Sequence, residues 1–432
     1  MSNWKEYNLR EIVNVKHGYA FRGEYFSETP TLDILLTPGN FSIGGGFKQG
    51  KLKYYNGDYP ISYKLNEGDI IVTMTDLSKE GDTLGYSAKI PKHNEIRYLH
   101  NQRIGLLQFT NEDFCKDYIY WVLRSRDYQK FIVNSATGST VKHTSPSRIC
   151  EYVFSAPDLP TQNNIAEILS SLDDKIELNN KINQELETLA QTLFKQWFIE
   201  FEFPNENGAP YKSSGGEMVD SELGEIPKGW KVTPLGSLLE LIIDYRGKTP
   251  LKLGMNWCEN GIKAISARNV KNRSLTNLDN VHIGSQKLYD IWMKDELKFG
   301  DVLLTSEAPL GETAILLEHH NFILSQRLFA LRANKKISPY YLFEYLSSDA
   351  GKNELERRQS GSTVVGIKQK ELLQITLLSP AIEIIKHHST LVAEIYKSIE
   401  NNDIENQELT NLRDTLLPKL ISGELELKNV KF

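Results

Sequence analysis

The sequence is poor in cysteine and has no long apolar segment. Its 432 residues include three cysteines, Cys115, Cys150 and Cys258, and no two of them form a C-x-x-C pair. This pattern excludes a disulfide framework and a zinc ribbon, and it fits a reducing compartment. No apolar run approaches the ~20 residues that span a bilayer, and the first residues lack the charged-then-apolar pattern of a signal peptide. We therefore expect a cytoplasmic protein that does not enter a membrane.

The sequence also lacks an excess of positive charge, because its formal net charge is −6. The deficit lies in two segments. Residues 159–203 hold 3 Lys and Arg against 8 Asp and Glu, and residues 381–432 hold 6 against 9. Residues 1–158 (19 against 18) and 204–380 (22 against 21) are nearly neutral. Such segments can present local basic faces while acidic helices face water or a protein partner, although charge alone fits plain solvated helices equally well.

Catalytic motifs are missing or incomplete in the sequence. Gly247-Lys248-Thr249 ends like a phosphate loop, but the leading glycine is absent. Gly44-Gly45-Gly46 lacks the strand and helix context of a dinucleotide site. Asp158 followed by Asp173-Asp174-Lys175 imitates a nuclease pattern, but the second group lies in a predicted helix. The adjacent histidine pairs lack the i, i+4 spacing of a zinc site. We expect no catalytic residue, metal or cofactor in this chain.

What the sequence does contain is a long internal repeat. Gly138-Ser139-Thr140 recurs as Gly361-Ser362-Thr363, and Asn183-Gln184-Glu185-Leu186 recurs as Asn406-Gln407-Glu408-Leu409. Both pairs share one offset (361 − 138 = 406 − 183 = 223). A repeat this long excludes a solenoid, whose period is about 20–50 residues. The chain therefore uses one unit twice, which suits a protein that reads two similar targets.

Each repeat begins with a globular segment, which we call a head. Gly68-Asp69 and Gly300-Asp301 each precede a short apolar run that is typical of a buried strand. Asn40 in the first head corresponds to Asn269 in the second. We expect an α+β fold in which two pseudo-symmetric globular recognition domains are separated by two long helices that form an antiparallel coiled coil. The predicted boundaries are 1–160 (domain 1), 161–203 (spacer helix 1), 204–229 (linker), 230–380 (domain 2), 381–422 (spacer helix 2) and 423–432 (C-terminal tail).

The two helical runs carry matching heptad seams. Apolar or related positions in 165–197 follow alternating steps of four and three residues, and the offset of 223 gives the second seam. The chain must leave helix one, build the second head and return, so we expect antiparallel helices. In an antiparallel pair, the numbers of two facing residues have a constant sum. With a sum of 585, Asn183 faces Asn402 and Asn179 faces Asn406. The same sum places Leu172 beside Arg413 and Trp197 beside His388.

Asparagine in a coiled-coil seam lowers stability but selects register. We hypothesise that the four seam asparagines fix the axial register of the helices, and with it the separation of the heads. The alternative is that they are exposed polar residues.

These segments resemble the specificity (S) subunit of type I restriction-modification enzymes. The resemblance covers essentially the whole chain and is strongest in residues 218–230, 194–198 and 416–425. It implies two target-recognition domains that each read half of a bipartite DNA site, with the helices as spacer and docking surface. It also implies two methyltransferase (M) subunits that carry S-adenosylmethionine, and restriction (R) motor-nuclease subunits in restriction complexes.

Polar residues that both heads share serve something common to the two, such as the fold, a DNA phosphate or a partner. These residues are Arg103 and Arg327, Ser139 and Thr140, and Ser362 and Thr363. The Gly-Ser-Thr turns offer N–H groups and hydroxyls that suit a phosphate, although a capped turn explains them equally well. The arginines can instead pair with core carboxylates.

Basic or amide-rich residues that differ between the heads are candidates for base reading. Arg and Lys can donate to guanine, and Asn to adenine, in the major groove. The candidates of the first head are Lys51, Lys53, Tyr54, Asn56, Lys79, Lys142, His143 and Arg148. Those of the second head are Arg246, Lys248, Arg268, Asn269, Lys271, Arg273 and Lys368.

The sequence therefore predicts a non-catalytic subunit that recognises double-stranded DNA and docks M and R subunits on its helices. It could equally serve a methylation-only system, because a motor-nuclease would be another chain. A protein-protein scaffold and a nuclease in one head are rivals of other classes. Salt-dependent, sequence-specific DNA binding would exclude the scaffold, and magnesium-dependent cleavage would establish the nuclease.

Overall fold

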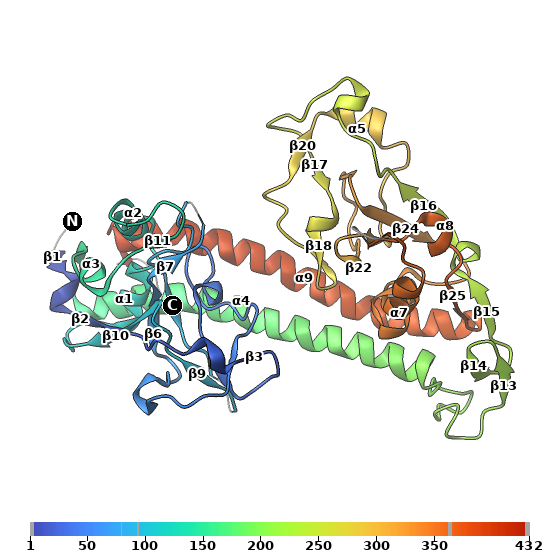
Figure 1. Ribbon diagram of the computed structural model, residues 1–432, viewed down its shortest axis with the longest axis horizontal. Helices are drawn as coiled ribbons and strands as arrows, with labels where there is room; N and C mark the ends of the chain where they lie inside the picture. The colour runs from blue at the N-terminus through green and yellow to red at the C-terminus, as the bar shows by residue number, and fades with distance from the viewer. Residues whose placement is uncertain (1–3, 79, 93–94, 362–364, 428–432) are drawn as a thin grey trace. The chain divides into compact units, whose positions relative to one another are not determined.

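The computed structural model describes residues 4–78, 80–92, 95–361 and 365–427 (Figure 1). The chain separates into two compact units. Unit 1 comprises Met1–Leu178 and Glu405–Phe432, and unit 2 comprises Asn179–Ile404. The boundaries fall inside the long helices α4 (Leu159–Phe194) and α9 (Ile382–Ile421). Each unit therefore contains one head together with a segment of each long helix.

The head of unit 1 is built on an antiparallel sheet. Its strand order is β2 (Val13–His17), β10 (Ile104–Phe109), β6 (Ile70–Thr73) and β8 (Ser87–Lys89). Every residue of β6 is buried, as predicted for the apolar run after Gly68-Asp69. Helices α1 (Lys116–Val122) and α2 (Arg126–Asn134) contribute Trp121, Tyr128 and other side chains to the same core.

A second sheet of this head has the order β3 (Phe26–Ser27), β5 (Tyr54–Tyr55), β4 (Asp33–Leu35) and β9 (Arg97–Leu99). Strands β4 and β9 run parallel. Strand β1 (Lys5–Asn8) pairs with β12 (Val153–Ala156), so the start and the end of the head lie side by side.

The head of unit 2 repeats this topology. Its main sheet has the order β16 (Leu239–Asp244), β24 (Leu328–Ala333), β21 (Val302–Ser306) and β22 (Leu310–Ile315). A smaller sheet holds β20 (His282–Gly284), β17 (Ile262–Ile265) and β23 (Ile323–Leu324), with β17 and β23 parallel. Strand β15 (Lys231–Pro234) pairs with β25 (Thr376–Ser379). Helices α6 (Pro339–Ser347) and α7 (Asp349–Arg357) complete the head. The predicted internal repeat is therefore confirmed for the main sheet, for the parallel strand pair of the smaller sheet and for the strand pair that closes the head, while the smaller sheet has three strands here and four in unit 1.

The linker predicted at 204–229 is not entirely loop. It contains a hairpin of β13 (Met218–Ser221) and β14 (Gly224–Pro227), in which Val219 pairs with Ile226. Ile226 is buried in the core of unit 2, and Gly224 supplies the positive φ of the turn (90°). The predicted linker therefore includes two strands, because this short hairpin is stabilised by packing rather than by its own apolar content.

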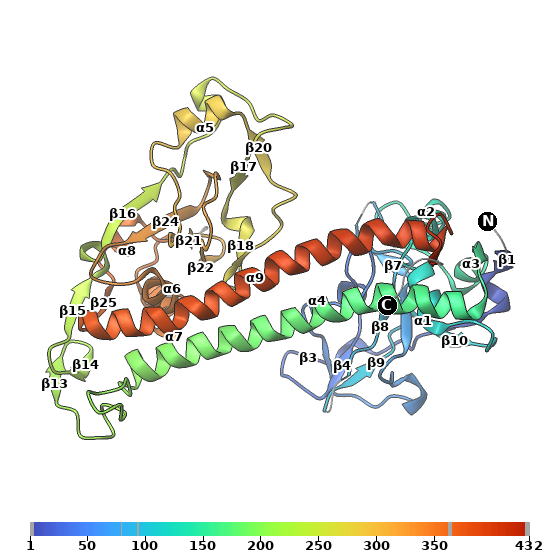
Figure 2. The ribbon, with the colours of Figure 1, turned by 180° about the vertical axis from the view of Figure 1, so that it is seen from behind.

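Segments of α4 and α9 pack antiparallel in each unit (Figure 2). In unit 2, Asn183 accepts a hydrogen bond from Asn402 at 2.7 Å, and the rings of Trp197 and His388 lie 5.5 Å apart. Both pairs were predicted from the sum of 585. In unit 1, Asp173 pairs with Arg413 at 2.6 Å, one residue from the predicted Leu172 contact. After Phe194, α4 continues as a π-helical turn (Lys195–Ile199).

The seam asparagines are not exposed polar residues in this region. Asn179 and Asn183 are 0% and 9% exposed. Asn183 also donates to Asp403 at 2.8 Å. The Asn183–Asn402 contact is therefore confirmed, whereas the pairing of Asn179 with Asn406 stays a prediction because these residues belong to different units.

Asn183→Leu is expected to lower the free energy of unfolding of unit 2 by about 1–3 kcal/mol. The substitution removes both hydrogen bonds of Asn183 and leaves the Asp403 carboxylate, whose pKa is already raised by burial, without this donor. Urea denaturation measures the change. The neighbouring Gln184→Leu, at an exposed position of α4, should change the free energy by less than about 0.5 kcal/mol. Equal effects of the two variants would contradict a role for Asn183 in the seam.

Candidate nucleic-acid interface

The Gly-Ser-Thr segment of unit 1 forms the tip of a hairpin. Thr137 and His143 exchange backbone hydrogen bonds of 3.0 and 2.8 Å, and Ser139 and Thr140 are exposed between them. Gly138 has φ 94°, and a Cβ atom there would lie 2.0 Å from the carbonyl oxygen of Val141. The turn therefore requires glycine, and it presents its hydroxyl groups to solvent.

A loop held by hydrogen bonds to Asp76 lies beside this hairpin. Strand β11 (Lys142–His143) pairs with β7 (Thr75–Asp76), and His143 Nδ1 is 3.2 Å from Thr75 Oγ1. The buried Asp76 accepts hydrogen bonds from the backbone N–H of Ser78 (2.7 Å) and from the Thr83 hydroxyl (2.7 Å). Burial raises the pKa of Asp76, but these hydrogen bonds outweigh it and leave the pKa lowered. Leu77, held at the tip of this loop, is 68% exposed.

The structure brings the two shared polar motifs of unit 1 together. The N–H of Met74 donates to the carbonyl of Arg103 (2.9 Å), and the N–H of Thr144 donates to the carbonyl of Met74 (3.0 Å). Arg103 and the returning strand of the Gly-Ser-Thr hairpin are thus joined through the end of one strand. We call this arrangement the shared edge.

Unit 2 has the same shared edge. The N–H of Ser306 donates to the carbonyl of Arg327 (2.9 Å), and the N–H of Ile367 donates to the carbonyl of Ser306 (2.9 Å). Arg327 is exposed and lies 3.3 Å from Glu307, so its predicted pairing with a carboxylate is seen at the surface rather than in the core. Ser362 and Thr363 lie outside the described residues, as does Lys79 of unit 1.

Other candidates of unit 1 differ in accessibility. Lys51, Lys53 and Asn56 are exposed around β5, and the Lys53 ammonium lies 3.8 Å above the Phe26 ring. Tyr54 is half-buried against the core of the second sheet. Arg148 is exposed and is paired with Glu151 at 2.8 Å.

Three candidates of unit 2 remain exposed, namely Arg268, Lys271 and Lys368. Arg246 is half-buried, pairs with Asp244 at 2.8 Å and donates to the Ile367 carbonyl at the shared edge (3.2 Å). Lys248 donates to the Trp292 carbonyl at 2.7 Å, and burial lowers its pKa. Lys248 therefore supports the fold rather than facing a ligand.

Besides Lys248, two further predicted base readers of unit 2 are held inside the fold. Asn269 is 4% exposed; its oxygen accepts the Ser266 N–H (3.0 Å) and its amide donates to the Thr276 carbonyl (3.1 Å). Asn40 caps the corresponding turn of unit 1 in the same way. Arg273 points inward and pairs with Glu344 at 2.7 Å. Both residues belong to the fold, because hydrogen bonds to neighbouring backbone hold the Asn269 amide and an ion pair with the buried Glu344 holds the Arg273 guanidinium.

Two arginines near the second Gly-Ser-Thr segment were missed by the sequence analysis. Arg357, Arg358 and Lys368 line an open cavity of about 620 Å³ together with Ser360. Glu354 forms ion pairs with both arginines, at 3.0 and 3.5 Å. The Arg-Arg pair three residues before the repeated turn was the available signal.

Two classes of site are not found in the part of the chain that the structure describes. No cluster of three or more His, Cys, Asp or Glu side chains there could hold a metal ion. No described helix is both long enough and apolar enough to cross a membrane.

Comparisons with known proteins agree on one family. Residues 1–188 and 227–413 match the family model described as "Type I restriction modification DNA specificity domain". The specificity subunit of the type I restriction enzyme HindI of Haemophilus influenzae is 25% identical, over 98% of this chain and 100% of its own length. The MjaIX specificity subunit of Methanocaldococcus jannaschii is 26% identical, over 73% of this chain and 70% of its own.

A solved structure shares the fold. The S subunit of a type I restriction-modification system from M. genitalium superposes with a TM-score of 0.56 at 16% identity. The alignment covers 97% of this chain and 96% of that structure.

Proposed function

Because the chain belongs to the type I restriction-modification DNA specificity family, we propose that its two heads each bind one half of a bipartite double-stranded DNA site. The observation that carries this proposal is the shared edge, which recurs in both units with the same hydrogen bonds. In each unit it places one arginine, Arg103 or Arg327, beside the chain segment that follows the Gly-Ser-Thr sequence.

The two heads combine common and different polar groups. Common groups at the shared edge suit phosphates, which are the same in every sequence. Exposed groups that differ, such as Lys51 and Lys53 in unit 1 and Arg268 and Lys271 in unit 2, suit base edges. This division lets one fold read two unrelated half-sites.

The long helices are proposed to dock partner subunits. They expose large apolar side chains that neither unit covers, among them Leu178 (51%), Leu189 (47%) and Leu412 (47%). Exposed apolar side chains on helices are typical of protein interfaces. The chemistry of the complex would then belong to two methyltransferase subunits, with S-adenosylmethionine bound to them, and to restriction subunits where these are present.

Methylome sequencing of cells with and without the gene tests the proposal. We expect one split motif, with methylated bases in both halves, that disappears with the gene. Replacing head 2 (residues 230–380) by the corresponding head of a relative should change only one half of the motif. A protein-protein scaffold would leave the methylome unchanged in both experiments.

Arg103→Ala and Arg327→Ala are each expected to weaken DNA binding by the assembled complex without changing the motif. Loss of one phosphate contact should reduce the slope of log affinity against log salt by about 1. Fluorescence anisotropy at several salt concentrations measures both quantities. Lys130→Ala, which removes an exposed cation of α2, a helix that holds none of the residues of the shared edge, is the matched control and should leave the slope unchanged. A slope unaffected by either arginine would exclude the shared edge as a phosphate site.

A further inference from the structure

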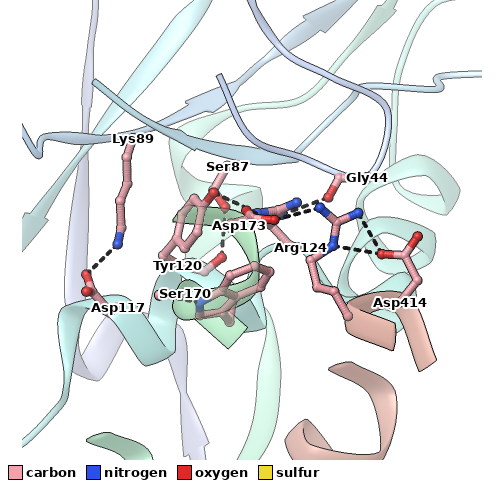
Figure 3. A network of polar contacts seen from close by, with 11 residues as sticks. Gly44, Ser87, Lys89, Asp117, Tyr120, Arg124, Ser170, Asp173 and Asp414 are labelled. Atoms are coloured by element: carbon pink, nitrogen blue, oxygen red, sulfur yellow. Dashed lines mark hydrogen bonds and ion pairs between the residues drawn. The ribbon is translucent and has the colours of Figure 1, made fainter. Parts of the chain in front are cut away.

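A buried arginine joins the head of unit 1 to both long helices (Figure 3). Arg124 follows α1, and its side chain is 3% exposed. Its Nε donates to the Gly44 carbonyl at 2.9 Å, and Nη1 donates to the Tyr120 hydroxyl at 2.8 Å and to the Asp173 carboxylate of α4. The guanidinium lies 4.3 Å from the centre of the Trp121 ring. This one side chain therefore contacts a head loop, a head helix and α4.

The network continues into α9. The other carboxylate oxygen of Asp173 accepts from Arg413 at 2.6 Å, and Arg413 also pairs with Asp414 at 2.7 Å. Breaking a buried ion pair by removing one partner is strongly destabilising, because the remaining charge is left without compensation in a poorly solvated site. Arg124 thus depends on Asp173, which only the long helix can supply.

This arginine explains the middle one of the three consecutive glycines of the sequence. Gly44, Gly45 and Gly46 have φ values of 84°, 86° and 94°. A Cβ atom on Gly45 would lie 2.6 Å from Cγ of Arg124. The backbone of the loop passes directly over the arginine, which only glycine allows.

Unit 2 joins its head to the helices with a different set of residues. Arg273, in the turn between β18 (Val270–Lys271) and β19 (Ser274–Leu275), donates to Glu344 of α6 at 2.7 Å and to the Tyr396 hydroxyl of α9 at 2.8 Å. Tyr396 is itself hydrogen-bonded to Glu344, whose side chain is 1% exposed. Glu187 of α4 also faces Arg273: burial raises the pKa of Glu187, and Arg273 opposes this shift.

Equivalent positions of the two repeats hold different residue types in these two networks. At the offset of Asn40 and Asn269 (269 − 40 = 273 − 44 = 229), Gly44 corresponds to Arg273. At the offset of 223, Trp121 corresponds to Glu344, Asp173 to Tyr396 and Arg413 to Ala190. The arginine comes from the turn after α1 in unit 1 and from the turn between β18 and β19 in unit 2. The carboxylate comes from the long helix in unit 1 and from the head in unit 2.

We propose that Arg124 and Arg273 are positioning residues that match each head to its own helix segments, so that a head functions in the other position only if its helix partners move with it. Head 1 brings a buried cation and needs a carboxylate on the helix. Head 2 supplies both the cation, Arg273, and its carboxylate, Glu344, and needs a hydroxyl group on the helix, which Tyr396 provides. In unit 2 the arginine also fixes a recognition loop, because Arg273 anchors the hairpin whose exposed residue Lys271 is a candidate base reader.

A chimera with head 1 in both positions tests this proposal. Residues 230–380 are replaced by a second copy of residues 4–157, and the chain is expressed with its partner subunits. The second copy of Arg124 then meets Tyr396 and Ala190 in place of Asp173 and Arg413. We expect methylation of the duplicated motif to fall at least about tenfold below that of the natural motif, because an unpaired buried cation shifts the folded-to-unfolded ratio by about 100-fold or more.

Three substitutions on the helices should restore the chimera. Tyr396→Asp, Ala190→Arg and Glu187→Thr install the residues that stand at the corresponding positions of unit 1, namely Asp173, Arg413 and Thr410. Tyr396→Phe, which removes the hydroxyl without supplying a charge, is the control and should not restore methylation. Thermal unfolding of the purified complexes should follow the same order.

The outcomes separate cleanly. Equal methylation by the chimera with and without the three substitutions, whether both are active or both inactive, overturns the proposal, and so does rescue by Tyr396→Phe. The test rests on the proposed function in that each head reads half of the motif. The unaltered chain is measured first, and a methylome without any split motif would contradict the proposed function rather than the positioning role.

Discussion

Asp301→Ala is expected to lower the free energy of unfolding of unit 2 by about 3–5 kcal/mol. The Asp301 side chain is 0% exposed. Its two oxygens accept from Nε and Nη2 of Arg332, each at 2.8 Å, and one of them also accepts the Lys298 N–H at 2.8 Å. Alanine would leave the Arg332 guanidinium, whose side chain is 14% exposed, without its carboxylate inside the fold. Hydrogen exchange of peptides from β21 and β24 measures the loss locally.

The internal repeat supplies a matched control for this variant. Asp69 stands at the corresponding place of unit 1, where it accepts the Asn66 N–H at 2.8 Å. The position of Arg332 is taken in unit 1 by Gln108, so no buried cation depends on Asp69. Asp69→Ala should therefore cost only about 0.5–1.5 kcal/mol, measured in β6 and β10. Similar losses in both units would show that the ion pair adds nothing to the turn.

Acidification from pH 6.5 to pH 4 is expected to destabilise unit 2 through His388. This residue is 0% exposed on α9, and within the described part of the chain neither of its ring nitrogens has a hydrogen-bond partner. It packs against the rings of Trp197 (5.5 Å) and Phe198 (4.8 Å). Burial, with a smaller effect of His387, lowers its pKa from 6.5 to about 4.

The sign of the effect follows from proton binding. Above pH 6.5 the imidazole is neutral in both folded and unfolded chains, so no penalty exists. Between pH 6.5 and about 4 the unfolded chain takes up a proton that the folded chain does not. The free energy of unfolding therefore decreases as the pH is lowered through this range. The pKa difference corresponds to a loss of up to about 3 kcal/mol.

Urea denaturation of the chain and of His388→Phe at pH 7 and pH 4.5 tests this expectation. The phenylalanine variant should lose less stability on acidification, because the titrating group is gone and the aromatic contacts are kept. His387→Gln, at the adjacent exposed position, should behave like the unaltered chain. Identical pH dependence of all three proteins would contradict the role of His388. His100 of unit 1 is also buried, with a pKa lowered to about 4, so some acid sensitivity should remain in every variant.

Features of the fold that are set by local pattern and by the repeat could be predicted from the sequence. The apolar runs after Gly68-Asp69 and Gly300-Asp301 became β6 and β21. The antiparallel helices and the contact of Asn183 with Asn402 followed from the heptad seam and the need for the chain to return. The hairpin of β13 and β14 could not be foreseen, since it depends on packing of Ile226 against a core assembled from distant segments.

The candidate interface was less accessible to sequence reasoning. Counting basic and amide residues in loops cannot distinguish Lys271, which is exposed, from Arg273, which two residues later is half-buried and paired with Glu344. The sequence also could not show that Arg103 and the Gly-Ser-Thr hairpin meet at one edge, because backbone hydrogen bonds through Met74 bring them together. The repeat identified which residues to compare, and three-dimensional contacts decided which of them face solvent.

Unit 1 is built from both ends of the chain, and this has a consequence for its folding during synthesis. Leu417 and Leu420, near the end of α9, are part of the same core as Leu169 and Trp121. The ribosome makes these leucines long after the N-terminal head. The core of unit 1 can therefore be completed only when almost the entire chain has been synthesised. Unit 2 is one continuous segment and can complete its core earlier. A premature stop codon before residue 405 should therefore damage the end of the protein that was translated first.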